Sequence, residues 1–232
     1  MPPLRDGDKR LYLVRHGETD WNLQDRIQGR TDNPLNPTGR KQAEAVSSFL
    51  ANEPLELITS SSLMRAGETA DAIACLHPAA VRLAGLPEFQ EMCFGDIEGQ
   101  TLTEIRATYK ATVAAWRSGD NARKWPGQGG ESPNDVAERG LDGLRRIGML
   151  PSSAANAIEA TARTERHILV AAHGRFNKIL LAALRGDVSM ASDLQQGNTA
   201  INVIDFAPDG SSEVRLLNCQ EHLKGSTSKS LS

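Results

Sequence analysis

The chain has 232 residues, 39% hydrophobic and 24% charged, as expected of a globular protein with one domain or one domain plus an insertion. Its net charge of −3 argues against nucleic-acid or membrane-surface binding, so any preference for anions must be local. Three cysteines without CxxC spacing favour a reducing compartment, and we expect a cytoplasmic protein. The N-terminal residues MPPLRDGDKR contain no apolar core, so we expect no secretory signal, and no apolar run approaches the roughly 20 residues that cross a bilayer.

Short apolar runs alternate with helical periodicities along the chain. The predicted order is a strand at 11–14, a helix at 36–53, a strand at 55–61, a helix at 63–76, a weak strand at 80–85, a strand at 166–174, a helix at 175–184, and a closing pair of strands at 199–206 and 213–219. Asn36 followed by Pro37 is typical of a helix start. This alternation predicts a three-layer α/β/α sandwich with a mainly parallel sheet, whose ligands bind beyond the carboxyl ends of the strands.

The middle of the chain, residues 96–165, breaks the alternation. It is helical with a Pro/Gly-rich interruption, KWPGQGGESP, and we interpret it as an insertion that forms a lid or side wall. We expect a single domain over residues 1–225. The polar, Ser-rich residues 226–232 are predicted to be a disordered tail.

Two predicted strands end in the same way. The first runs into Arg15-His16-Gly17, and a later one into His173-Gly174. Each glycine permits a sharp turn, and both histidines should face one crevice, where helix N-termini would attract an anion. Arg15, and Arg65 just after the second strand, offer planar forks suited to phosphate. The residues alone therefore indicate a phosphate pocket.

The motifs also resemble those of the histidine phosphatase superfamily, the phosphoglycerate mutase-like group. LVRHGETDWN resembles its signature, and further segments follow in the family's order over about residues 10–206. These segments are RIQGRTDNPLNPTGRKQA, SSLMRAGETA, EFQEMCFGDIEGQT, GGES, VAAHGRFNKILLAAL and GNTAINVIDF. The resemblance implies an α/β fold and metal-independent hydrolysis of a small-molecule phosphate ester, with no cofactor.

Roles for individual residues follow from this resemblance. His16 would be the nucleophile that accepts the phosphoryl group, and Glu91 the general acid, with Glu88 as a competing carboxylate three residues earlier. The implied phosphate-binding residues are Arg15, Thr19, Asn22, Arg65, His173 and Gly174.

Attack by an imidazole requires an unprotonated nitrogen. Two nearby guanidinium groups would disfavour the imidazolium form of His16, and its other nitrogen should donate to a backbone carbonyl. The arginines and a cationic His173 would match the charge on the phosphoryl oxygens. No HxH or HExxH spacing is present, so we expect no catalytic metal.

The identity of the phosphoryl acceptor distinguishes a phosphatase from a cofactor-dependent phosphoglycerate mutase. Mutases that resemble this chain carry a longer insertion with paired arginines and a proline run, whereas AAWRSGDNARKWPGQGGES has neither, which favours a phosphatase. A catalytically inactive, ligand-binding relative is the third hypothesis. Possible specificity residues are Arg117, Arg123, Lys124 and Arg175, the last accompanied by Lys178.

Overall fold

The computed structural model describes residues 2–151 and 166–224. The predicted tail at 226–232 and residues 152–165 of the predicted insertion lie outside this range. Within the described range, no helix combines the length and apolarity needed to cross a membrane.

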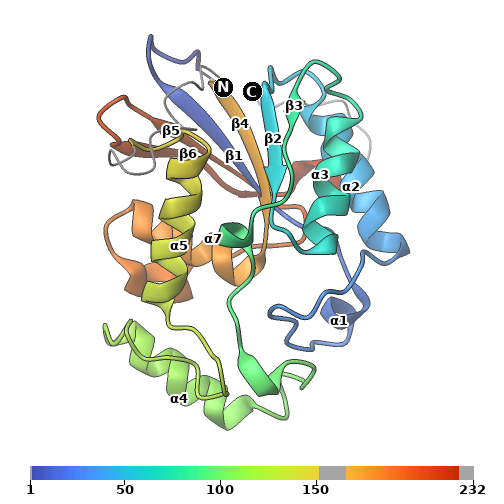
Figure 1. Cartoon of the computed structure of the whole chain (residues 1–232). Helices are drawn as coiled ribbons and strands as arrows, with labels where there is room; N and C mark the ends of the chain where they lie inside the picture. Colours follow the sequence, from blue (N-terminus) through green and yellow to red (C-terminus); the bar gives the residue numbers. More distant parts are fainter. Residues whose placement is uncertain (1, 152–165, 225–232) are drawn as a thin grey trace.

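A six-stranded sheet in the order β3-β2-β4-β1-β5-β6 forms the centre of the molecule (Figure 1). Its strands are β1 (Lys9–Arg15), β2 (Leu57–Ser60), β3 (Val81–Arg82), β4 (His167–Ala172), β5 (Ile201–Phe206) and β6 (Ser212–Cys219). The first four are mutually parallel, and the closing pair adds two antiparallel strands at one edge. The mainly parallel sheet is confirmed, although the weak third strand shortens to two residues.

Helices cover both faces of the sheet. The helices are α1 (Asp20–Leu23), α2 (Pro37–Leu50), α3 (Met64–Ala74), α4 (Arg106–Arg117), α5 (Pro133–Arg146) and α7 (Gly174–Leu184). Short 3-10 segments lie at Pro87–Phe89, Gly95–Ile97, Val188–Ser192 and Glu221–Leu223. Side chains alternate along β4, so that Leu169 packs with α2 and α3 while Ile168 packs with α5 and α7. This arrangement confirms the predicted three-layer sandwich.

The two helices that the structure describes within the predicted insertion, in residues 96–151, lie in different places. α5 packs against α7 and buries Val136 and Leu144 in the same core as the sheet, because its apolar residues recur at helical spacing. α4 lies beyond the carboxyl ends of the parallel strands, at the bottom of Figure 1. Only α4 therefore has the position of a wall, whereas α5 belongs to the sandwich layer.

The start of α2 confirms the predicted cap. The Asn36 side chain accepts a hydrogen bond from the Gly39 N–H at 2.8 Å and donates to Glu18 at 2.9 Å. We expect Asn36→Ala to lower the free energy of unfolding by about 1 kcal/mol, because a helix N–H loses its acceptor. Thermal denaturation should show a melting temperature about 2–4 °C lower.

The matched control for this prediction is Ser48→Ala, on the exposed side of the same helix. The Ser48 hydroxyl donates only to the Glu44 carbonyl, and alanine is a better helix former there. Equal melting temperatures for Asn36→Ala and the unmodified protein would show that the cap contributes nothing.

Candidate active site

The two histidines stand next to each other at the carboxyl edge of the sheet. Arg15 pairs with Ala172 in the β1–β4 register, so His16 and His173 follow at neighbouring strand ends. Their ring centroids are 5.2 Å apart, and both rings are buried. The two His-Gly corners therefore face the same crevice, as the sequence indicates.

Glycine is required after His16. A Cβ atom on Gly17 would lie 2.5 Å from the Gly39 carbonyl oxygen, which a real side chain could not tolerate. A Cβ atom on Gly174 would lie 3.2 Å from Nε of Arg15. The first corner therefore requires glycine, whereas a Cβ atom at the second would crowd the Arg15 side chain.

His16 is held as a neutral ring with one nitrogen available. Its Nδ1 lies 2.6 Å from the Gly17 carbonyl oxygen, which can only accept, so Nδ1 carries the proton and Nε2 is left with its lone pair. Burial, followed by the charges of Arg65 and Arg15, lowers the pKa of His16 well below its usual value. This is the tautomer and the protonation state that a nucleophile needs.

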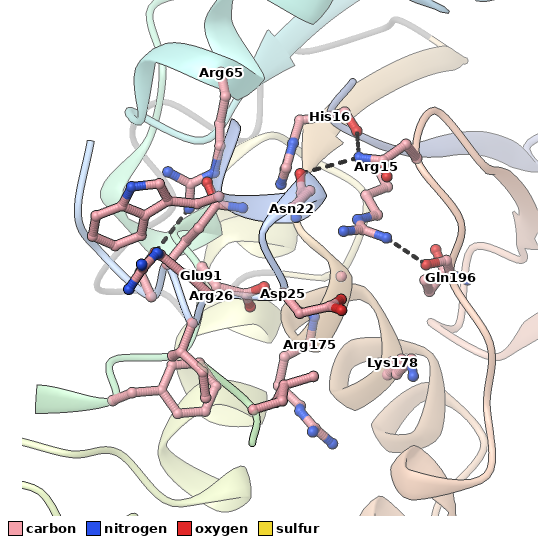
Figure 2. Close-up of a pocket in the computed structure, with 18 of the residues that line it drawn as sticks. Arg15, His16, Asn22, Asp25, Arg26, Arg65, Glu91, Arg175, Lys178 and Gln196 are labelled. Atoms are coloured by element: carbon pink, nitrogen blue, oxygen red, sulfur yellow. Dashed lines mark hydrogen bonds between the residues drawn. The ribbon is translucent and has the colours of Figure 1, made fainter. Parts of the chain in front are cut away.

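Arg65, at the start of α3, is completely buried and fixed by backbone oxygens. Its two terminal nitrogens donate to the carbonyls of Thr31 and Gly29, each at 2.8 Å. Arg15 donates from Nη1 to the Gln196 carbonyl at 2.7 Å. Figure 2 shows both guanidinium groups beside His16. They are placed by backbone carbonyls rather than by ion pairs with carboxylates, and the charge of Glu91 offsets only part of the cost of burying them.

Several buried nitrogen atoms in this group have no protein partner. Nε of Arg15, Nε of Arg65 and both ring nitrogens of His173 make no hydrogen bond to any residue of the described ranges. Buried polar atoms are nearly always hydrogen-bonded, so such exceptions require an explanation. An oxyanion placed beside His16 would supply it.

His173 differs from the sequence expectation in its charge. Burial, Arg65 and the neighbouring His16 lower its pKa well below the usual value, so the ring is neutral in the protein alone. The imidazolium form of His173, which is expected from the sequence, would appear only if the charge of a dianionic ligand raised its pKa. His173 is not among the residues that line the cavity.

The Glu91 carboxylate is built into the N-terminus of α7. It accepts hydrogen bonds from the backbone N–H groups of Met92 at 2.9 Å, Arg175 at 3.0 Å and Phe176 at 2.7 Å. Free helix N–H groups were expected to attract the phosphate, but here the first turn of α7 holds the protein's own carboxylate. Glu91 lines the cavity, whereas Glu88 does not and pairs with Arg146 at 2.8 Å.

Arg139, which sequence reasoning missed, positions the loop that carries Glu91. From α5 it donates to the carbonyls of Glu88 at 2.9 Å, Gln90 at 2.7 Å and Glu91 at 3.1 Å. Three bonds from one guanidinium fix the loop against the sandwich layer. α5 therefore contributes to the site through this loop.

The two neutral donors expected from the signature have different positions. Asn22 lines the cavity. Its Oδ1 accepts hydrogen bonds from the Thr19 N–H at 3.2 Å and from the Asn198 side chain at 3.3 Å, so the NH₂ group of the Asn22 amide points away from these two donors. Thr19 is buried, caps α1 and donates to Gln28 at 2.9 Å, and it does not line the cavity. Asn198, missed by sequence reasoning, also donates to the His16 carbonyl at 3.2 Å.

The cavity in front of His16 has a volume of about 390 Å³. Arg15, Arg65, Glu91 and Gly174 line it, together with Lys178 and Arg175 from α7. Its volume exceeds that of a phosphate group, so it also has room for part of an alcohol. No group of three or more His, Cys, Asp or Glu residues within 2–151 and 166–224 is arranged to hold a metal ion.

Three of the possible specificity residues lie outside this cavity and next to carboxylates. Arg117 lies 3.3 Å from Asp193, Arg123 2.8 Å from Asp120, and Lys124 3.7 Å from Asp135. Arg175 does line the cavity, but its guanidinium donates to the Tyr109 hydroxyl at 2.7 Å.

A neutral imidazole between a buried and a half-buried guanidinium group, at the carboxyl edge of an α/β sandwich, is the arrangement expected of an enzyme of phosphoryl transfer. The chain belongs to the histidine phosphatase superfamily (branch 1), whose sequence model matches residues 11–220. The predicted family is thereby confirmed.

Named relatives agree with this assignment. The chain is 30% identical over 216 residues to an uncharacterised phosphatase, PhoE, of Bacillus subtilis, covering 93% of this chain and 97% of that protein. It is 35% identical over 178 residues to a glucosyl-3-phosphoglycerate phosphatase of Mycolicibacterium vanbaalenii, covering 77% and 75%.

Solved structures give the same result. A mycobacterial glucosyl-3-phosphoglycerate phosphatase in complex with VO3 has a TM-score of 0.75 at 29% identity, covering 91% of this chain and 100% of that one. Phosphoserine phosphatase from Entamoeba histolytica, in complex with 3-phosphoglyceric acid, has a TM-score of 0.73 at 28% identity, covering 92% and 98%. The predicted fold and enzyme class, a phosphoric monoester hydrolase, are confirmed.

Proposed function

We propose that this protein hydrolyses small phosphate monoesters without a metal ion, through a phosphohistidine formed on His16. The observation that carries the proposal is the set of buried, unpartnered donors on Arg15, Arg65 and His173 around that ring. They provide a fixed environment for the phosphoryl oxygens, in which no reorganisation is needed at the moment of reaction. The substrate class is supported by the phosphatase relatives.

The reaction has two steps. Nε2 of His16 attacks phosphorus, the bond to the ester oxygen breaks, and Glu91 donates the proton that the leaving alkoxide requires. Water then attacks the phosphohistidine, Glu91 takes a proton from it, and the P–N bond breaks to release inorganic phosphate. Arg15 and Arg65 remain beside the phosphoryl oxygens throughout, because backbone carbonyls hold both side chains.

A phosphatase agrees better with the wall of the site than a mutase does. The loop after α4 places Arg123 and Lys124 beside Asp120 and Asp135 rather than in the cavity, so these cations do not hold a second phosphorylated molecule there. Water is then the acceptor with access to the phosphohistidine.

A panel of phosphate esters, assayed with a chelator and without bisphosphoglycerate, tests this function. We expect inorganic phosphate to be released. Isomerisation of 3-phosphoglycerate only when the bisphosphate is added would instead indicate a mutase. Folded protein that does neither would be the inactive, ligand-binding relative.

We also propose that the protein acts in the cytoplasm. All three cysteines are free thiols, in agreement with a reducing compartment. Fractionation of cells that express the tagged full chain would check this proposal.

A further inference from the structure

A second cavity opens beside the catalytic one. It has a volume of about 540 Å³ and lies between α4, α7 and Ser192. Tyr109, Arg175 and Lys178 line both cavities, so these side chains form the junction between the two spaces. A substrate whose phosphoryl group lies at His16 could extend its alcohol portion past this junction.

The arginines around the second cavity already have partners. The Arg175 guanidinium donates to the Tyr109 hydroxyl and lies 5.8 Å from the Tyr109 ring centroid and 5.7 Å from that of Trp116. In Figure 2 it is directed away from His16. Arg117 lies 3.3 Å from Asp193. These contacts hold the guanidinium groups of Arg175 and Arg117 at the wall of the second cavity.

Lys178 is different. It is half-buried at the junction, and no residue within 2–151 and 166–224 pairs with its ammonium group by a hydrogen bond or an ion pair. Burial, then the charges of Arg175 and Arg15, lower the pKa of Lys178 to about 8, against the opposing effect of Glu91. A half-buried cation without a counterion is costly, and a ligand anion would offset that cost.

We propose that the second cavity is a subsite for the alcohol portion of the substrate, and that Lys178 binds a carboxylate on that portion. A single ammonium group balances one negative charge, which is the charge of a carboxylate. A phosphate is better matched by guanidinium groups, and those of Arg175 and Arg117 already have other partners here. This inference rests on the proposed function, because hydrolysis at His16 fixes where the alcohol portion begins.

Two esters of similar shape test the subsite directly. 3-Phosphoglycerate carries a carboxylate where glycerol 3-phosphate carries a hydroxymethyl group. We expect the protein to prefer 3-phosphoglycerate, and Lys178→Gln to raise its KM about tenfold or more, as for loss of a charged hydrogen bond. The KM for glycerol 3-phosphate should change less than about twofold, since it offers no anion to Lys178.

Two further variants control this experiment. Lys41→Gln removes the same charge from the exposed face of α2 and should change neither KM. Lys178→Arg keeps a cation at the junction and should retain most of the preference. Melting temperatures would show that each variant is folded.

The dependence of KM on pH gives an independent measurement. Lys178 is protonated below its pKa of about 8, so the KM for 3-phosphoglycerate should rise as the pH increases through that value. Lys178→Arg should abolish this rise, because arginine stays charged. The other charged groups around Lys178 are Arg15, Arg175 and Glu91, with Lys110 and Arg117 on α4. All of them are present in both proteins.

Either of two results would overturn the subsite. One is a protein without a preference for 3-phosphoglycerate, and the other is an equal loss on both esters in Lys178→Gln, which would place Lys178 on the phosphoryl group. In both cases p-nitrophenyl phosphate would still be hydrolysed. Failure of the proposed function would appear differently, as no phosphate release from any ester.

Discussion

Replacing His16 with alanine should abolish phosphate release. We expect kcat/KM to fall by on the order of 10⁵-fold, the size of loss produced by removing a covalent nucleophile in other enzymes. The structure gives the reason: Nε2 of His16 keeps its lone pair, and the guanidinium groups of Arg15 and Arg65 lie beside this ring. Steady-state release of phosphate from a panel ester is the measurement.

The matched control is His167→Ala. His167 lies at the opposite end of β4 from the site, and its loss should leave kcat/KM within about twofold, as for a change that touches neither substrate nor catalytic groups. A rapid-quench experiment with a radiolabelled ester should also trap an acid-labile label on the unmodified protein and none on His16→Ala. Turnover that survived in His16→Ala, with the fold intact by circular dichroism, would exclude the phosphohistidine.

Glu91→Gln should produce a loss that depends on the leaving group. Alkyl phosphates need a proton on the departing oxygen, so their kcat/KM, which reports transfer to His16 and not the later hydrolysis step, should fall by about 10²–10⁴-fold. p-Nitrophenyl phosphate, whose phenolate leaves unaided, should lose less than about tenfold. Because Glu91 accepts three backbone N–H bonds and the amide cannot accept all of them, the melting temperature should also decrease.

Glu88→Gln distinguishes the role of Glu88 from that of Glu91 in the same loop. Glu88 pairs with Arg146 and lies outside the catalytic cavity, so this variant should lose some stability and keep the same activity on both kinds of ester. Equal losses on alkyl and aryl esters in Glu91→Gln would show that Glu91 is not the proton donor. A loss confined to alkyl esters in Glu88→Gln would transfer the role to Glu88.

The sheet and the histidine pair could be predicted because their signals are local. β1 and β4 are continuous apolar runs that end in a His-Gly pair, and parallel strands bring such ends to one edge. Asn36 and Pro37 likewise mark the start of α2 within two residues. In each case the physical cause lies within a few residues of its effect.

The remainder of the site depends on contacts between distant segments. Arg139 reaches Glu91 across 48 positions of sequence, and Arg117 on α4 lies 3.3 Å from Asp193 beyond α7. The occupation of the first turn of α7 by Glu91 is of the same kind, since 84 positions separate Glu91 from Arg175. A sequence pattern can indicate a cation or the start of a helix. It does not show which distant group will pair with that cation or accept hydrogen bonds from the free N–H groups of that helix.

The placement of Arg15 and Arg65 has a consequence for evolution. Their positive groups are desolvated, lie near each other and lack carboxylate partners, which weakens the folded state. The same two positive groups allow the pocket to bind a doubly charged phosphate ester. Selection for stability alone would therefore reduce catalytic activity. The free energy that offsets the cost of these charges must come from the two apolar cores on the faces of the sheet.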